Sequence, residues 1–222
     1  FKINENEIIG LLGPNGCGKT TTIGMILGLL KPTSGKVLIN GLDINSSEKI
    51  SLLGKINFAS PYVELPKKLT VKQNLEIYAR LYCVKDIEER IESVANDLNL
   101  SKILNKRNGE LSSGQKNRVS LAKSLINKPK FLFLDEPTAS LDPDVGDFVR
   151  NYIENYKKDN ELTILLASHN MSEVERLCDE VVMMKEGSIV DSGTCNDLIK
   201  KHGRANLEDT FLKIARGKNE LV

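Results

Sequence analysis

Gly13-Pro14-Asn15-Gly16-Cys17-Gly18-Lys19-Thr20 fits the pattern G-x-x-x-x-G-K-[ST] of a loop that binds phosphate groups. An apolar run at residues 8–12 precedes this phosphate loop, and apolar residues with helical spacing follow it at Ile23, Ile26, Leu27 and Leu30. The pattern therefore predicts a strand, a loop and a helix in the order that the motif requires. At an average glycine content, the pattern would arise by chance in roughly one chain in a hundred of this length.

The residue types in the phosphate loop suit a polyphosphate ligand. Glycines let backbone amides converge on the anion, and the following helix points its positive end towards it. We expect Lys19 to reach the outer phosphates and the Thr20 hydroxyl to bind Mg²⁺. Cys17 is expected to fill a tight turn with a small side chain rather than to serve in redox chemistry.

A second motif is Phe131-Leu132-Phe133-Leu134-Asp135-Glu136, in which four apolar residues lead into two acids. It predicts a strand buried on both faces, whose carboxyl end carries the acids to the ligand edge of a parallel sheet. There Asp135 would hold the Mg²⁺ shell, and Glu136 would orient and deprotonate an attacking water. Alone, the acids would by about three to one be a solvated turn before Pro137. The phosphate loop upstream favours the functional interpretation.

A third motif is Leu111-Ser112-Ser113-Gly114-Gln115. Ser112 and Ser113 are favoured helix N-caps, Gly114 permits close backbone approach, and apolar residues with helical spacing follow at Val119, Ala122, Leu125 and Ile126. The motif predicts a second helix N-terminus that suits an anion. An isolated Ser-Ser-Gly would be better interpreted as an ordinary capped helix, because capping serines are common.

These three motifs are followed by the turn Ser140-Leu141-Asp142 and by Ser168-His169 after the apolar strand 163–167. In this order they resemble the motifs of the ATP-binding subunit of an ABC transporter, over nearly the whole chain. The Leu111–Gln115 signature separates that family from other phosphate-loop ATPases and GTPases. The resemblance implies an α/β fold, with a phosphate-loop NTPase core, a mainly parallel sheet, an antiparallel β edge and an inserted helical subdomain. It also implies ATP and Mg²⁺ as cofactors.

The resemblance further implies how the site residues work. In the family, the signature binds the γ-phosphate held by a partner subunit's phosphate loop, so two ATP molecules lie between two head-to-tail copies. His169 would contact the γ-phosphate and steady Glu136 and the water, although a lone histidine is by about four to one a structural residue. The residues that would contact nucleotide are Gly13, Pro14, Asn15, Gly16, Cys17, Gly18, Lys19, Thr20, Thr21, Ser112, Ser113, Gly114, Gln115 and Asp142.

Two departures from the family pattern stand out. The chain opens at Phe1, just upstream of the phosphate-loop strand, so a first strand and an adenine-stacking aromatic residue are expected to be missing. Where relatives carry a glutamine after the strand equivalent to residues 56–59, this chain has Ser60-Pro61. Ser60 could supply a hydroxyl ligand to Mg²⁺ in its place. The neighbouring apolar residues Tyr62, Val63 and Leu65 are about equally consistent with local packing and with a docking groove for a partner helix.

The pattern along the chain predicts one ABC ATPase domain. Residues 37–39 suggest one member of an antiparallel strand pair, and residues 55–59 a core strand. Helices are expected at 71–81, at 86–98 and after the signature, within a helical subdomain at about 61–127. Residues 1–60 and 128–202 would form the nucleotide-binding core, with a helical face at 145–156, and residues 203–222 a short C-terminal helix. His202 is expected at a solvated helix end.

Composition agrees with a single α/β unit. The chain has 222 residues, 40% hydrophobic and 27% charged, and its net charge of +1 gives no overall basic field for nucleic acid. We see neither an apolar stretch of membrane-spanning length nor a signal peptide. We therefore expect a cytoplasmic location, peripheral to a membrane through permease subunits. The four scattered cysteines indicate neither a zinc site nor a disulfide framework.

The sequence thus predicts a dimeric ATPase subunit that works on separate membrane permease subunits. The tail 207–212 resembles export-type subunits, and the transported substrate would be selected by another chain. One alternative is a soluble ABC-type ATPase, which would usually carry two cassettes or long coiled coils. Another is a regulatory module that binds ATP without turnover. The missing glutamine supports the regulatory module, whereas Glu136 and His169 argue against it.

Overall fold

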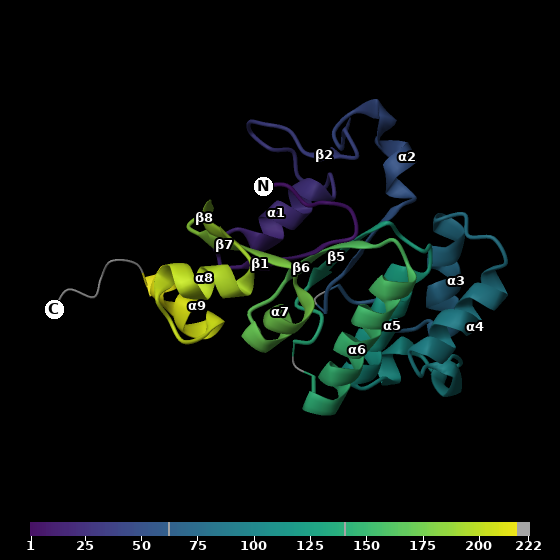
Figure 1. The fold of residues 1–222 in the computed structure, drawn as a ribbon. Helices are drawn as coiled ribbons and strands as arrows, with labels where there is room; N and C mark the ends of the chain where they lie inside the picture. Colours follow the sequence, from purple (N-terminus) through teal and green to yellow (C-terminus); the bar gives the residue numbers. More distant parts are fainter. Residues whose placement is uncertain (62, 140, 217–222) are drawn as a thin grey trace. The chain divides into compact units, whose positions relative to one another are not determined.

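The computed structural model describes residues 1–61, 63–139 and 141–216 (Figure 1). The chain divides into two compact units. The first contains Phe1–Lys49 and the chain from Thr163 onward, and the second contains Ile50–Leu162. Among the described residues, no helix is long and apolar enough to span a membrane.

Among the described residues, β1 (Ile8–Leu12), β6 (Thr163–Ala167), β7 (Glu180–Lys185) and β8 (Ser188–Gly193) form the sheet of the first unit. β1 lies between β6 and β7 and is parallel to both, whereas β8 is antiparallel to β7. All five residues of β1 are buried, as expected for a parallel strand with a neighbour on each side. The predicted combination of mainly parallel strands and an antiparallel edge is confirmed.

Helices and a small hairpin complete the first unit. They are α1 (Lys19–Ile26), α7 (Met171–Leu177), α8 (Cys195–His202), α9 (Leu207–Arg216), the 3₁₀ turn η1 (Ser47–Lys49) and the antiparallel pair β2 (Leu38–Ile39) and β3 (Leu42–Asp43). The yellow helices α8 and α9 lie side by side (Figure 1) and share an apolar cluster with Leu12 and Met183. The sheet and the C-terminal helices therefore have a common core.

The second unit combines a parallel strand pair with helices. β4 (Ile56–Ala59) pairs with β5 (Phe131–Asp135), and the helices are α2 (Ile50–Leu53), α3 (Val71–Leu81), α4 (Ile87–Asp97), α5 (Ser113–Leu125) and α6 (Pro143–Asp159), with 3₁₀ turns η2 (Ser101–Ile103) and η3 (Asn108–Glu110). α3, α4 and α5 contact one another (Figure 1). The helical subdomain expected at about 61–127 lies within this unit, and its separation from a nucleotide-binding core stays a prediction.

Side chains define the ends of the longer helices. Thr70 and Gln73 form a reciprocal capping box at the start of α3, with bonds of 3.1 and 2.9 Å between side chain and backbone. Pro143 occupies the first turn of α6, where its missing N–H costs no helical bond. On α4, which lies within the predicted helix 86–98, the buried residues are Ile91, Val94 and Ala95. Local sequence therefore sets these boundaries.

One helix ends earlier than its apolar spacing predicts. α1 stops at Ile26 rather than continuing to Leu30. Gly28 has a φ of +68°, and the amides of Leu29 and Leu30 both bond back to the Gly24 carbonyl. A Cβ at position 28 would lie 3.1 Å from Ile44. Glycine therefore terminates the helix with a tight left-handed turn.

His202 differs from the expectation of a solvated helix end. Its Nε2 lies 2.7 Å from the Asp191 carboxylate on β8, and Lys201 contacts the other carboxylate oxygen at 2.7 Å. Burial raises the pKa of Asp191, but hydrogen bonds from Lys201 and His202 outweigh it and lower the pKa overall. The C-terminal end of α8 is therefore bound to the edge strand β8 through Asp191.

Candidate functional site

The phosphate loop, Gly13–Thr20, connects β1 to α1 in the first unit. Gly16 and Gly18 have φ values of +79° and +107°, which glycine adopts at no steric cost. The Cys17 amide closes a turn onto the Pro14 carbonyl at 3.1 Å. Gly18 is the N-cap of α1 and makes no side-chain capping bond to the first amides of the helix. Asn15, Gly16, Thr20 and Thr21 are exposed, so this face of the loop is accessible to a ligand.

Lys19 is held inside the loop. Its Nζ donates to the Gly13 carbonyl at 2.6 Å and to the Pro14 carbonyl at 3.4 Å, and the residue is only 8% exposed. The ammonium therefore bonds to backbone carbonyls of the loop. An anion entering the loop would exchange these carbonyl contacts for charged oxygens, which form stronger hydrogen bonds.

The loop is supported by the β7–β8 hairpin. The Gly187 amide donates to the Cys17 carbonyl at 3.0 Å. A Cβ added at Gly13 would lie 2.2 Å from the Cys17 sulfur and 2.6 Å from the Met184 carbonyl oxygen, so only glycine fits there. The buried Cys17 side chain fills the turn, as the sequence predicts. The loop is thus packed on one side and exposed on the other.

His169 follows β6 at the sheet edge that also carries the phosphate loop. In the parallel register Leu11 pairs with Ala167, so the chain leaves both strands at the same edge. The buried Ser168 hydroxyl contacts Glu173 at 2.5 Å and accepts a bond from the Asn170 amide at 3.1 Å. These bonds fix the turn on which the exposed His169 stands.

In the second unit, Asp135, Glu136 and Ser60 lie at the ends of neighbouring strands. Ala59 pairs with Leu134, so Ser60 and Asp135 leave β4 and β5 side by side. All three residues are at least nine-tenths buried, and each is engaged in polar interactions. Glu136 has a φ of +53°, an uncommon backbone conformation for a residue with a side chain. The strand ends thus concentrate a hydroxyl and two carboxyls.

The signature begins α5. Ser112 accepts a bond from the Gln115 amide at 3.3 Å, and the Gln115 side chain accepts one from the Ser112 amide at 3.1 Å. This reciprocal capping box confirms Ser112 as the N-cap, with Ser113 as the first helical residue. A Cβ at Gly114 would lie 3.2 Å from Val145 on α6, which requires a small residue. Asp142 is the exposed N-cap of α6 and makes no side-chain capping bond.

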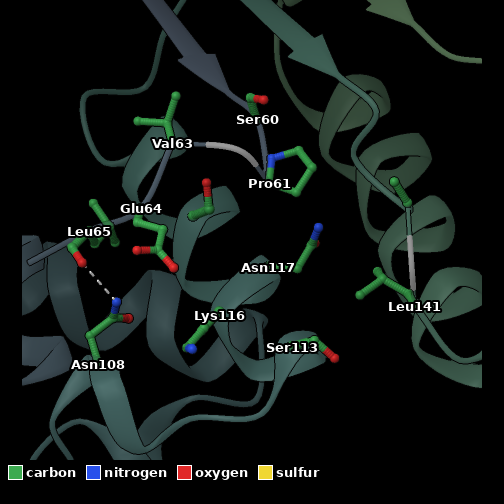
Figure 2. A pocket seen from close by; sticks show the side chains of 12 residues that line it. Ser60, Pro61, Val63, Glu64, Leu65, Asn108, Ser113, Lys116, Asn117 and Leu141 are labelled. Carbon is green, nitrogen blue, oxygen red and sulfur yellow. Dashed lines mark hydrogen bonds between the residues drawn. The ribbon is translucent and has the colours of Figure 1, made fainter. Parts of the chain in front are cut away.

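A cavity of about 270 Å³ in the second unit borders several of these segments. Figure 2 shows Ser60 and Pro61 at one end, Ser113, Lys116 and Asn117 of α5 along one side, and Leu141 on another. Asn108 donates to the Leu65 carbonyl at 3.1 Å on its wall. Leu65 is buried and Val63 exposed, whereas Tyr62 and Ser140 lie outside the described residues. The cavity therefore adjoins the Ser60–Pro61 segment, the signature helix and the turn after Glu136.

Sequence reasoning did not identify Asn117. Its Nδ2 donates to the Pro137 carbonyl at 2.6 Å, which ties α5 to the turn immediately after Glu136. That turn is closed by the Ala139 amide, which donates to the Glu136 carbonyl at 3.1 Å. The only sign of this contact in the sequence is a polar residue two positions after the signature. Helical periodicity does not show which group such a side chain will bind.

The available donors suit Mg²⁺ bound together with a phosphate ligand. No group of three or more His, Cys, Asp or Glu side chains that could hold a metal occurs among the described residues. Mg²⁺ commonly takes only one or two protein carboxylates and completes its octahedron with phosphate oxygens and water. In the second unit, Asp135 and Ser60 place one carboxylate and one hydroxyl at adjacent strand ends. In the first unit, considered by itself, Thr20 has an exposed hydroxyl.

The predicted residues form two groups. The phosphate loop with Thr20, Thr21 and His169 belongs to the first unit. Ser60, Asp135, Glu136, the signature and Asp142 belong to the second. Within each group, strand register brings residues that are distant in sequence to one edge.

Comparisons with known proteins agree with these motifs. The family model described as ABC transporter matches residues 1–139. The ABC transporter ATP-binding protein NatA of Bacillus subtilis is 33% identical, over 97% of this chain and 88% of NatA. Nod factor export ATP-binding protein I of Rhizobium etli is 35% identical over 90% of this chain, and carnitine transport ATP-binding protein OpuCA of Listeria monocytogenes 30% over 100%. The chain spans 63% and 55% of these two relatives.

Solved structures share the fold. One, described as the ATP binding subunit of an ABC transporter, superposes with a TM-score of 0.86 at 26% identity, covering 96% of this chain and 89% of its own. Another is cbiO1 from Clostridium perfringens, described as part of the transporter complex cbiONQ. Its TM-score is 0.79 at 31% identity, covering 90% of this chain and 82% of its own.

Proposed function

The chain belongs to the ABC transporter family of ATP-binding subunits, and on this premise we propose that it hydrolyses ATP to ADP and phosphate to power transport through separate membrane permease subunits. The observation that carries the proposal is the phosphate loop. Its left-handed glycines, its helix start without a side-chain capping bond and the inward-held Lys19 support a site for a polyphosphate. The signature helix supports an ABC-type ATPase over other phosphate-loop enzymes.

The chemistry assigned to the site is general-base hydrolysis. Loop amides and Lys19 bind the phosphates and stabilise charge on the transferred group. Mg²⁺, when bound through Asp135 and the Thr20 or Ser60 hydroxyl, supplies further charge stabilisation. Glu136 takes the proton of the attacking water, and His169 orients the water and the γ-phosphate. The hydrogen-bonded turn next to His169 supports this orienting role.

The working unit proposed is a dimer with shared sites. The signature begins a helix with exposed serines, suited to a phosphate presented by a second subunit. In a head-to-tail pair, each site would combine one chain's phosphate loop with the other chain's signature. ATP would close the pair, and hydrolysis would reopen it.

The direction of transport proposed is export. The resemblance of the tail 207–212 to export-type subunits and the name of the Nod factor relative support it, while OpuCA is named for carnitine transport. The substrate would be chosen by the permease. A multi-span permease that is encoded beside this chain and co-purifies with it would support transport, and its transport assay would fix the direction.

Phosphate release from Mg²⁺-ATP tests the proposed activity. The chain should release phosphate with saturation kinetics, and Lys19→Ala should bind a fluorescent ATP analogue poorly. Lys31→Ala, which removes an exposed lysine beyond α1, should behave like the wild type. Tight ATP binding without phosphate release, alone and with a permease, would instead support the regulatory module.

A further inference from the structure

Lys123 is a buried lysine that the proposed mechanism does not use. It lies near the end of α5 and is only 8% exposed. Its Nζ donates to the Phe58 carbonyl at 2.6 Å and lies 5.3 Å from the centroid of the Tyr78 ring. Within the described part of the chain, no carboxylate pairs with this ammonium.

A second contact joins the same two segments in the opposite direction. The side-chain amide of Asn57 donates to the Lys123 backbone carbonyl at 3.4 Å and to the side-chain oxygen of Asn127 at 2.8 Å. A side chain of α5 thus bonds to the backbone of β4, and a side chain of β4 bonds to the backbone of α5. Phe58 precedes Ser60 by two residues, and α5 starts at the signature. The pair of contacts therefore links the signature helix to the Ser60–Pro61 segment.

An apolar side chain could fill this place at lower cost. Burying an ammonium without an acidic partner is unfavourable, and a methionine would pack without that penalty. The same burial lowers the pKa of Lys123 to about 8. Tyr78 on α3 is the titratable side chain against the ammonium. A charge kept at such a cost indicates a role beyond packing.

We propose that Lys123 is a positioning residue for ATP hydrolysis, whose charged ammonium fixes the Ser60–Pro61 segment relative to the signature helix. The inference rests on the proposed ATPase function. It requires the charged form, because a neutral amine is a weaker donor and loses its attraction to the Tyr78 ring. Lys123 acts through the backbone at Phe58.

This role predicts opposite pH trends for stability and activity. Lys123 holds its proton less tightly in the folded chain than in the unfolded chain. Between about pH 8 and the ordinary lysine pKa of 10.5, it therefore adds stability as the pH rises. The kcat for ATP should instead fall as the pH passes about 8, where the ammonium is lost. A residue that only packs the core would make activity follow stability.

Two substitutions and a control test the proposal by kcat and KM profiles from pH 6 to 10, with urea unfolding at each pH. Lys123→Met should lower kcat about tenfold or more, change KM little and lose the alkaline decline. Lys123→Arg should keep most activity and stay active above pH 9, because guanidinium remains charged. Lys130→Met, which removes a half-exposed lysine of the same unit, should match the wild type.

The outcomes separate this inference from the proposed function. A wild type without hydrolysis would overturn the proposed function, and the role of Lys123 with it. An active wild type whose alkaline decline persists unchanged in Lys123→Met would overturn the role of Lys123 alone. If Lys123→Met does not fold, the pH profile of Lys123→Arg tests the proposal instead. A fall in kcat still centred near pH 8 in Lys123→Arg would contradict the proposal.

Discussion

At the scale of single residues, Glu136 combines burial with an unfavourable backbone conformation. A left-handed φ costs a residue with a side chain about 1–2 kcal/mol, and Glu136 keeps it while only 8% exposed. Two hydrogen bonds hold this turn in place. The Ala139 backbone amide donates to the Glu136 carbonyl, and the Asn117 side-chain amide donates to the Pro137 carbonyl. Such strain is typical of positions where side-chain direction matters more than stability.

Replacing Glu136 with glutamine should abolish turnover while ATP binding persists. Glutamine keeps the size and polarity of the side chain but cannot accept the water's proton, so hydrolysis should fall at least about a hundredfold. Steady-state phosphate release would measure the loss, and light scattering should detect an ATP-locked dimer. Glu161→Gln, at an exposed acid of the same unit, is the control. Activity within about threefold of the wild type, roughly 0.7 kcal/mol in barrier, would refute the assignment.

Ser60 is expected to contribute to Mg²⁺ binding in place of the family's glutamine. Ser60→Ala should raise the Mg²⁺ concentration needed for half-maximal hydrolysis, because water must then replace the hydroxyl. Pro61→Gln should lower that concentration or leave it unchanged. Titration of Mg²⁺ at saturating ATP is the measurement, with melting temperatures to monitor the fold. An unchanged requirement in Ser60→Ala would leave water as the simpler ligand.

At the scale of elements, the two capping boxes form a matched pair. Thr70→Ala and Ser112→Ala should each destabilise the chain by about 1 kcal/mol, because each frees amides at a helix start. Only Ser112→Ala should also reduce ATPase activity, since only α5 carries the signature. Urea unfolding and phosphate release would separate the effects. Equal losses of activity in the two variants would show that Ser112 acts through stability alone.

Local sequence predicts several elements to the residue and fails where tertiary contacts decide. α3 at 71–81 and β6 at 163–167 match their predicted bounds, because a capping threonine and a short apolar run define them. α1 ends early because Gly28 turns beneath Ile44, a contact that apolar spacing does not encode. The His202–Asp191 contact also depends on β8 and α8 meeting in space.

At the scale of the whole molecule, the order of the motifs identifies the family. That the site residues act together in one reaction stays a prediction. The phosphate loop was recognisable because its glycines have a backbone function that is visible in sequence. Lys123 was not, because its burial depends on a carbonyl and a ring from two other elements. The assigned roles of Asp135, Glu136, His169 and the signature remain predictions.

Mixed dimers should show whether two chains share each site. With Lys19→Ala in one chain and Ser112→Arg in the other, one composite site keeps both an intact loop and an intact signature. With both changes in one chain beside a wild-type partner, each site loses one component. Phosphate release should therefore be higher in the first arrangement. Equal rates would indicate that each chain hydrolyses ATP alone.

The Gly187–Cys17 hydrogen bond has a consequence for biosynthesis. The phosphate loop is translated before its hairpin support and before the flanking strands β6 and β7, which begin at Thr163. At about 5–20 residues per second, roughly 170 residues of synthesis leave the loop unsupported for about 10–30 s. A nascent chain arrested before Gly187 should therefore fail to retain ATP. Newly made protein would acquire its ligand only after Gly187 has been translated and the hairpin has formed.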